Sequence, residues 1–185
     1  MPVNCITMSA NAQLPEHIKN LLANPQAPEI ILEELMPLVT QTLQADRCFI
    51  HAHNPLLGVG RIAFCWCKND FIPNVLQQKW APDTATLPQE DPLFAAALRT
   101  APSIFVDDVT TADPQVLNRA FKDKTFGHRA LIHAHLVMEG KLWGILQPAI
   151  FGKPRKWSAS DRDFIQTLLP QVAPIVKMFV MQTKF

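Results

Sequence analysis

The chain has 185 residues, a length typical of one domain, and its 17 basic and 16 acidic side chains leave a formal net charge of +1. This balance indicates neither the polycation of a nucleic-acid-binding protein nor an acidic tail, so we expect no nucleic-acid partner. Apolar residues make up 48% of the chain and charged residues 18%. That composition argues against intrinsic disorder and predicts one sizeable core.

The sequence also points to the compartment. No apolar run approaches the roughly 18 residues that a membrane span needs, and the opening MPVNCITMSANAQ lacks the basic and apolar regions of a signal peptide. We therefore expect a soluble, cytoplasmic protein without membrane contact. The four cysteines show no CxxC spacing and no disulfide pattern, so reduced thiols are expected. They are Cys5, Cys48, Cys65 and Cys67.

The first part of the chain predicts two helices. Apolar residues from Leu14 to Ala45 recur at helical spacing. Pro25 and Pro28 divide this stretch into a short first helix and a longer second one. We therefore distinguish an N-terminal segment with a short helix, residues 1–27, from a single domain over residues 28–185.

Strands and short helices alternate through the rest of the domain. Periodicity, turn signals and capping residues predict strands at 46–54 and 61–69, an irregular excursion at 70–90, a helix at 91–100, a strand at 103–107, a helix from its N-cap Asp113 to about Thr125, strands at 129–138 and 141–151, and a last helix beginning at Ser158 or Ser160. This order predicts an α+β fold with an antiparallel sheet.

Three segments together resemble the GAF sensor domain family, and within it the modules of cyanobacterial photoreceptors. They are ADRCFI from Ala45, KLWGIL from Lys141 and PRKWSASDRDF from Pro154. The resemblance covers most of the chain from about Ile30 onwards. It implies a central antiparallel sheet of about five or six strands, with the terminal helices on one face and a ligand pocket on the other. It also implies a sensory role, with pairing through helices.

The residues that hold a bilin covalently in such photoreceptors are missing from the matching positions. Residues 116–123 contain no cysteine, Leu93 stands where a second thiol would lie, and Ala149 stands where a chromophore-contacting histidine would lie. Because a thioether needs a thiolate nucleophile, we expect no covalent bilin. A non-covalent tetrapyrrole stays open as a cofactor. The chain also lacks the Asp-Glu dipeptide of the cyclic-nucleotide subclass.

Two pairs of metal-binding residue types lie in the first predicted hairpin: His51, His53, Cys65 and Cys67. Each pair shares one strand face, a donor set that suggests zinc. If Asn54 pairs with Gly60, however, His53 lies opposite Arg61, and roughly 20 Å of strand separates it from Cys67. The four side chains then cannot reach one ion, so we expect no metal site. A redox or metal sensor that uses these thiols or Cys48 is the weakest alternative.

Candidate pocket residues follow from the sheet face opposite the terminal helices. His133 and His135 share a strand face, so their imidazoles are candidates to face a ligand and to titrate near neutral pH. The other pocket candidates are Phe94, Asp107 and Trp80. No nucleophile stands beside an obvious base and no phosphate-binding loop is present, so we expect no enzymatic activity.

The last predicted helix carries more apolar surface than one core-facing stripe needs. Val176, Val180 and Met181 on this extra surface predict a homodimer through the terminal helices, or docking of a partner signalling protein. The expected function is that of a stand-alone GAF-domain sensory or regulatory protein that binds a small ligand, a partner protein or both. The alternative is a ligand-free interaction or assembly subunit whose pocket has collapsed around aromatic side chains such as Phe71.

Overall fold

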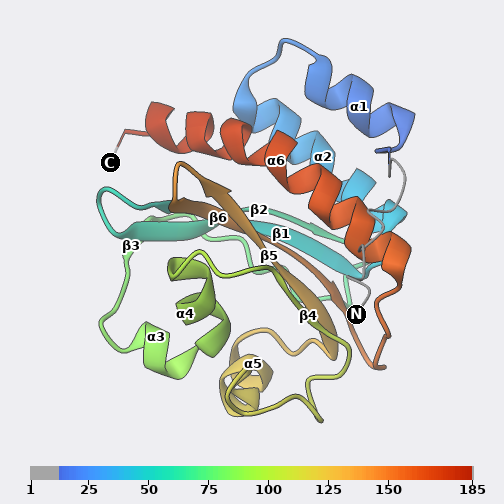
Figure 1. Ribbon diagram of the computed structural model, residues 1–185, viewed down its shortest axis with the longest axis vertical. Helices are drawn as coiled ribbons and strands as arrows, with labels where there is room; N and C mark the ends of the chain where they lie inside the picture. The colour runs from blue at the N-terminus through green and yellow to red at the C-terminus, as the bar shows by residue number, and fades with distance from the viewer. Residues whose placement is uncertain (1–12, 185) are drawn as a thin grey trace, which may run out of the picture.

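One antiparallel sheet separates two groups of helices in the computed structural model, which describes residues 13–184 (Figure 1). The strands are β1 (Arg47–Asn54), β2 (Val59–Cys67), β3 (Ala81–Pro82), β4 (Ile104–Val106), β5 (Ala130–Met138) and β6 (Lys141–Ile150). They form a six-stranded sheet in the order β3-β2-β1-β6-β5-β4. The predicted α+β fold with an antiparallel sheet is confirmed.

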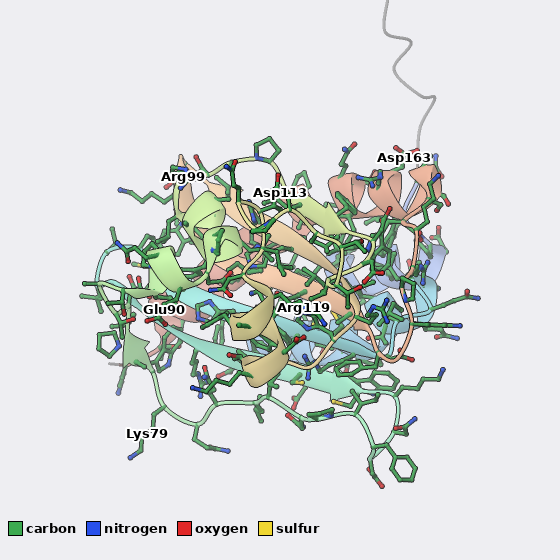
Figure 2. All side chains as sticks on the ribbon, turned by 90° about the horizontal axis from the view of Figure 1, so that it is seen from below. Lys79, Glu90, Arg99, Asp113, Arg119 and Asp163 are labelled. Atoms are coloured by element: carbon green, nitrogen blue, oxygen red, sulfur yellow. The ribbon has the colours of Figure 1, made fainter. Side chains whose placement is uncertain are left out.

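The helices divide between the two faces of this sheet (Figure 1). One face carries α1 (Glu16–Ala23), α2 (Pro28–Thr42) and α6 (Ala159–Gln182). The other carries α3 (Leu87–Glu90), α4 (Pro92–Leu98) and α5 (Arg119–Thr125). Figure 2 looks at this second face from below, where Glu90 and Arg119 mark the end of α3 and the start of α5. The terminal helices therefore lie together, as the resemblance implied.

The larger core lies between the sheet and the terminal helices. Because side chains alternate along a strand, Cys48, Ile50 and Ala52 of β1 all point into this core and have no exposed surface. The helices α2 and α6 each add an apolar stripe, which includes Leu35 and Leu168. The short α1 packs its own apolar face into the same cluster.

Local turn and capping chemistry sets the ends of several elements. The hydroxyl of Ser158 accepts a hydrogen bond from the Asp161 N–H at 3.1 Å, and the Asp161 carboxylate accepts one from the Ser158 N–H at 2.9 Å. This capping box confirms the predicted start of the last helix at Ser158. Glu139 and Gly140, with φ of 53° and 67°, form the predicted tight turn between β5 and β6.

The first hairpin departs from strict strand alternation. A bulge pairs His51 with Ile62 on one side and Ile50 with Phe64 on the other. Ile62 therefore lies on the same face as His51, whereas strict alternation along β2 would place it on the same face as Phe64. The extra residue of the bulge is not marked by Gly or Pro, so the sequence gives no sign of it.

The middle helix begins later than predicted. Asp113 accepts a hydrogen bond from the Gln115 N–H at 2.8 Å and closes an isolated turn. The helix α5 begins instead after Asn118, whose side chain accepts a hydrogen bond from the Phe121 N–H at 3.2 Å. Both Asp and Asn are common N-caps, so the pattern alone does not choose between them. The predicted excursion also contains β3 and α3, which its mixed polarity did not indicate.

The helix α6 lies closely on the sheet. Among the described helices it alone is long and apolar enough to cross a membrane by length and composition, a property that core helices of soluble proteins share. Val176 and Val180 have no exposed surface, so the predicted interface cannot include them, and only Met181, 55% exposed, stays on the surface. A Cβ on Gly144 of β6 would lie 2.8 Å from the His51 carbonyl oxygen and 3.2 Å from Val176. Glycine thus permits this close approach.

Val176→Glu should lower the free energy of unfolding by about 3 kcal/mol or more, because the new carboxylate would be buried without a partner. Met181→Glu on the same helix is the matched control and should change it by no more than about 0.5 kcal/mol. Urea unfolding followed by circular dichroism measures both. Equally small effects would show that Val176 lies at the surface.

Candidate functional site

A cavity of about 190 Å³ lies between the sheet and the helices α3, α4 and α5. Its walls are largely apolar and include the rings of Phe49, Phe94, Phe121 and Phe126. Drug-sized ligands occupy sites of about 300–1,000 Å³, and an engineered cavity of about 150 Å³ holds benzene. The cavity therefore suits a ligand of one or two rings.

The polar floor of the cavity comes from neighbouring strands. Gln147 of β6 pairs with Phe49 of β1, and two residues along the same strands Ile145 pairs with His51. Between β5 and β6, Leu131 pairs with Ala149 and Ala134 pairs with Leu146, which places His133 of β5 opposite Gln147. The residues that line the cavity are Phe49, His51, His133, Ile145 and Gln147. Three polar side chains thus project from three adjacent strands into one apolar enclosure.

An ion pair buried in the roof joins two short helices. The Lys122 ammonium of α5 donates to the Asp91 carboxylate at 2.7 Å, and their side chains are only 1% and 8% exposed. Asp91 also accepts from the Leu93 N–H at 3.1 Å and so caps α4. Burial lowers the pKa of Lys122, and the Asp91 charge opposes that shift. The Lys122 nitrogen also lies 5.3 Å and 5.0 Å from the ring centroids of Phe121 and Phe126.

A chain of hydrogen bonds fixes the imidazole that faces the cavity from β5. The Nδ1 of His135 lies 2.6 Å from the carbonyl oxygen of Ala101, and its Nε2 lies 2.9 Å from the Nδ1 of His133. His133 lines the cavity and His135 does not. Burial lowers the pKa of both rings and holds that of His133 well below its usual range, whereas titration near neutral pH was predicted. His135 therefore positions His133.

A buried guanidinium holds the far end of the roof. Arg47 has no exposed surface and donates to the carbonyl oxygens of Pro73 at 2.7 Å and Phe126 at 3.4 Å. Its Cζ lies 4.9 Å from the ring centroid of Phe151. Arg47 thus connects the excursion after β2 and the end of α5 to the first residue of β1.

Three stacked rings lie close to this guanidinium, and two of them, Phe49 and Phe126, also line the cavity. Phe126 stacks on Phe49 with centroids 5.7 Å apart and on His128 with centroids 5.5 Å apart. Neither ring nitrogen of His128 has a hydrogen-bond partner among residues 13–184. Burial, together with the charges of Lys122 and Arg47, holds the pKa of His128 well below its usual range.

Two of the predicted pocket residues lie elsewhere. Asp107 accepts a hydrogen bond from the Trp157 N–H at 3.1 Å and anchors the connection into α6. Trp80 packs against the helix-side core, where it stacks on Phe179 of α6 with centroids 6.4 Å apart. Neither residue lines the cavity.

The other aromatic candidates also separate. Phe94 lines the cavity together with His133. Phe71 is 94% exposed on the loop after β2, so the aromatic collapse expected for a ligand-free subunit does not form around it. Sequence analysis missed Gln147 and the partners Asp91 and Lys122. The one available signal was Gln147, a lone amide in the KLWGILQPAI strand, which is apolar after Lys141.

The first hairpin pairs in a different register from the one assumed for its thiols and histidines. Asn54 pairs with Val59 and not with Gly60 as predicted. No group of three or more His, Cys, Asp or Glu side chains that could hold an ion occurs in the part of the chain that the structure describes. Cys65 and Cys67 lie with their sulfurs 4.0 Å apart, and burial and the Cys65 thiol raise the pKa of Cys67 to about 11. Cys67 is therefore a weak nucleophile at neutral pH.

The GAF domain family profile matches residues 27–176, so the chain belongs to this family. It is similar to the phycocyanobilin-bound GAF domain of a cyanobacterial phytochrome, with 17% identity, a TM-score of 0.69 and coverage of 91% of this chain and 94% of that one. It is also similar to the GAF domain of Acinetobacter phosphoenolpyruvate-protein phosphotransferase, with 12% identity, a TM-score of 0.67 and coverage of 89% of this chain and 91% of that one. The GAF domain of Thermosynechococcus elongatus PixJ is 18% identical, with a TM-score of 0.62 and coverage of 84% of this chain and 88% of that one. These likenesses show the fold alone. No curated protein matches.

Lys122→Met should lower the free energy of unfolding by about 3 kcal/mol, because it leaves the Asp91 carboxylate buried without a cation. Asp91→Asn keeps a side chain that can cap α4. The double variant should lose less stability than the two single variants lose together, by about 1 kcal/mol or more. Arg119→Met removes the exposed pair with Asp123 from the same helix and should change stability little. Urea titrations of all four variants test this coupling, and strictly additive losses would contradict it.

His128→Phe should raise the free energy of unfolding at neutral pH by about 1 kcal/mol, because it removes two unpartnered buried nitrogens and keeps a ring against Phe126. The unfolded chain protonates His128 near its ordinary pKa while the folded chain does not, so acidification below about pH 6.5 favours unfolding. The variant should weaken that acid dependence. The exposed His17→Phe serves as control in urea titrations at several pH values. A loss of stability at neutral pH in His128→Phe would refute this account.

Proposed function

We propose that this GAF domain is a sensory or regulatory module that binds a small ligand non-covalently in the cavity. One observation carries the proposal. The Nδ1 of His51 and the Nε2 of Gln147 are buried in the cavity lining, and neither has a hydrogen-bond partner among the described residues. A buried polar atom without a partner costs about 1–3 kcal/mol, which a hydrogen-bonding ligand would recover.

Volume and side-chain chemistry favour a ligand smaller than a tetrapyrrole. The cavity of about 190 Å³ is below the size of a drug-sized site, and a four-ring bilin needs more room. None of Cys48, Cys65 and Cys67 lines it, which supports the expectation that no bilin attaches covalently. The bilins in the titles of similar structures belong to those proteins.

The polar groups of the cavity favour binding over catalysis. Lys122 is paired with Asp91, and His133 is bonded to His135, so neither stands as a base beside a nucleophile. We infer a non-enzymatic protein that works in the cytoplasm. The apolar face of α6 packs on the sheet, which supports a soluble protein.

A second role is self-association, or docking of a signalling partner, through the terminal helices. Its support is the exposed apolar side chains of these helices. Met178 and Met181 are 49% and 55% exposed, and Ile30 of α2 is 45% exposed. Methionine side chains adapt readily to apolar partners. This patch is smaller than the predicted one, because Val176 and Val180 belong to the core of the domain.

Ile145→Phe tests the cavity as the binding site. Ile145 lines the cavity and is 3% exposed, so the larger ring should fill space that a ligand needs. Fragments of one or two rings found by saturation-transfer NMR should bind this variant about tenfold or more weakly, since small ligands depend on burial. Ile30→Phe, the same change on the exposed face of α2, should leave binding intact. Equal binding to both variants would place the ligand elsewhere.

A further inference from the structure

We propose that the ligand is a neutral, planar molecule of one or two rings with a carboxamide or lactam edge, whose N–H donates to the Nε2 of His133 and whose carbonyl accepts from the amide of Gln147. The inference rests on the proposed function and names the chemical class of ligand for that cavity. Each half of the edge follows from a separate observation.

The donor requirement follows from the hydrogen-bond chain behind His133. The carbonyl oxygen of Ala101 can only accept, so the Nδ1 of His135 carries the proton of their 2.6 Å bond. In a neutral ring the Nε2 of His135 is then a bare acceptor, and the Nδ1 of His133 must donate to it across 2.9 Å. The Nε2 of His133 therefore carries a lone pair and acts as an acceptor, which a ligand donor can satisfy.

The acceptor requirement follows from Gln147. Its Nε2 is buried without a hydrogen-bond partner in residues 13–184, and its side chain lines the cavity. Rotation of a terminal amide about its last torsion is broad and nearly two-fold, so this nitrogen can turn to a ligand carbonyl. Gln147 stands opposite His133 on the adjacent strand, where Cβ atoms are about 4.5–5.5 Å apart. Both groups can thus reach one amide edge.

The charges around the cavity favour a neutral ligand. The ammonium of Lys122 is matched by Asp91 at 2.7 Å. Arg47 does not line the cavity, and its guanidinium donates to the carbonyl oxygens of Pro73 and Phe126. A carboxylate in place of the amide would set its oxygen lone pairs against the bare Nε2 of His133, with no hydrogen between the two atoms.

The aromatic walls favour a flat ring. Phe49, Phe121 and Phe126 line the cavity, and Phe94 meets the His51 ring edge-on, with centroids 5.8 Å apart and planes at 88°. Rings in such walls gain from offset stacking and from edge-to-face contact with a planar ligand. The volume of about 190 Å³ accommodates one or two rings against these walls.

A series of four monocyclic probes tests the edge on the unmodified chain. Benzamide donates and accepts, acetophenone only accepts, ethylbenzene does neither, and benzoate carries a charge. We expect benzamide to bind about tenfold or more tightly than each of the other three, measured as dissociation constants by ligand-observed NMR at neutral pH. This comparison needs no variant and does not depend on whether a substituted chain folds.

Variants then assign the preference to residues. In His133→Phe, which keeps a ring of similar size, and in Gln147→Leu, the advantage of benzamide over ethylbenzene should fall about tenfold. The exposed His17→Phe should retain it. Thermal unfolding of each variant confirms that it folds.

The possible results separate this inference from the proposed function. Ethylbenzene binding as tightly as benzamide, with both weakened by Ile145→Phe, would overturn the amide edge and leave the cavity as the site. Benzoate binding most tightly would overturn the neutral ligand and direct attention to Arg47. Failure of all four probes to bind would overturn both the inference and the proposed function.

Discussion

The buried ion pair between Asp91 and Lys122 is the interaction on which the ligand-binding half of the structure depends. The helices that it joins, α4 and α5, have seven residues each, too few to be stable in isolation. Asp91 both caps α4 and receives the ammonium of α5, so one carboxylate sets the start of one helix and the position of the other. Because the two charges are paired, the roof adds no net charge to the cavity wall.

The sheet serves two purposes because its side chains alternate. In β1, Cys48 and Ile50 point to the terminal helices and pack in the large apolar core, whereas Phe49 and His51 point to the cavity. The first side is filled by long helices with continuous apolar stripes. The second is covered by short helices held by specific polar contacts, among them those of Arg47. Stability thus comes mainly from one face, and the capacity for recognition from the other.

Features with a local cause could be read from the sequence, and features with a distant cause could not. The turn at Glu139 and Gly140 and the cap at Ser158 depend on neighbouring residues, and both were predicted. The fold followed from such elements and from the resemblance they carried. The partner of Lys122 lies 31 residues away and was missed. Of the cavity residues, Phe94 and His133 were anticipated because strand faces and helix positions are periodic.

Gly144 brings β6 into close contact with α6, next to the cavity-lining residue Ile145. On its helix side a single missing side chain brings Val176 of α6 against the strand backbone, next to the carbonyl of His51, whose ring faces the cavity. A packed interior of this kind has low compressibility and transmits displacement. A displacement of the strand backbone at this point would therefore press directly on the side chain of Val176 in α6. The floor of the cavity and the longest helix are in direct contact there. The sheet therefore links the cavity to α6 as well as separating the two.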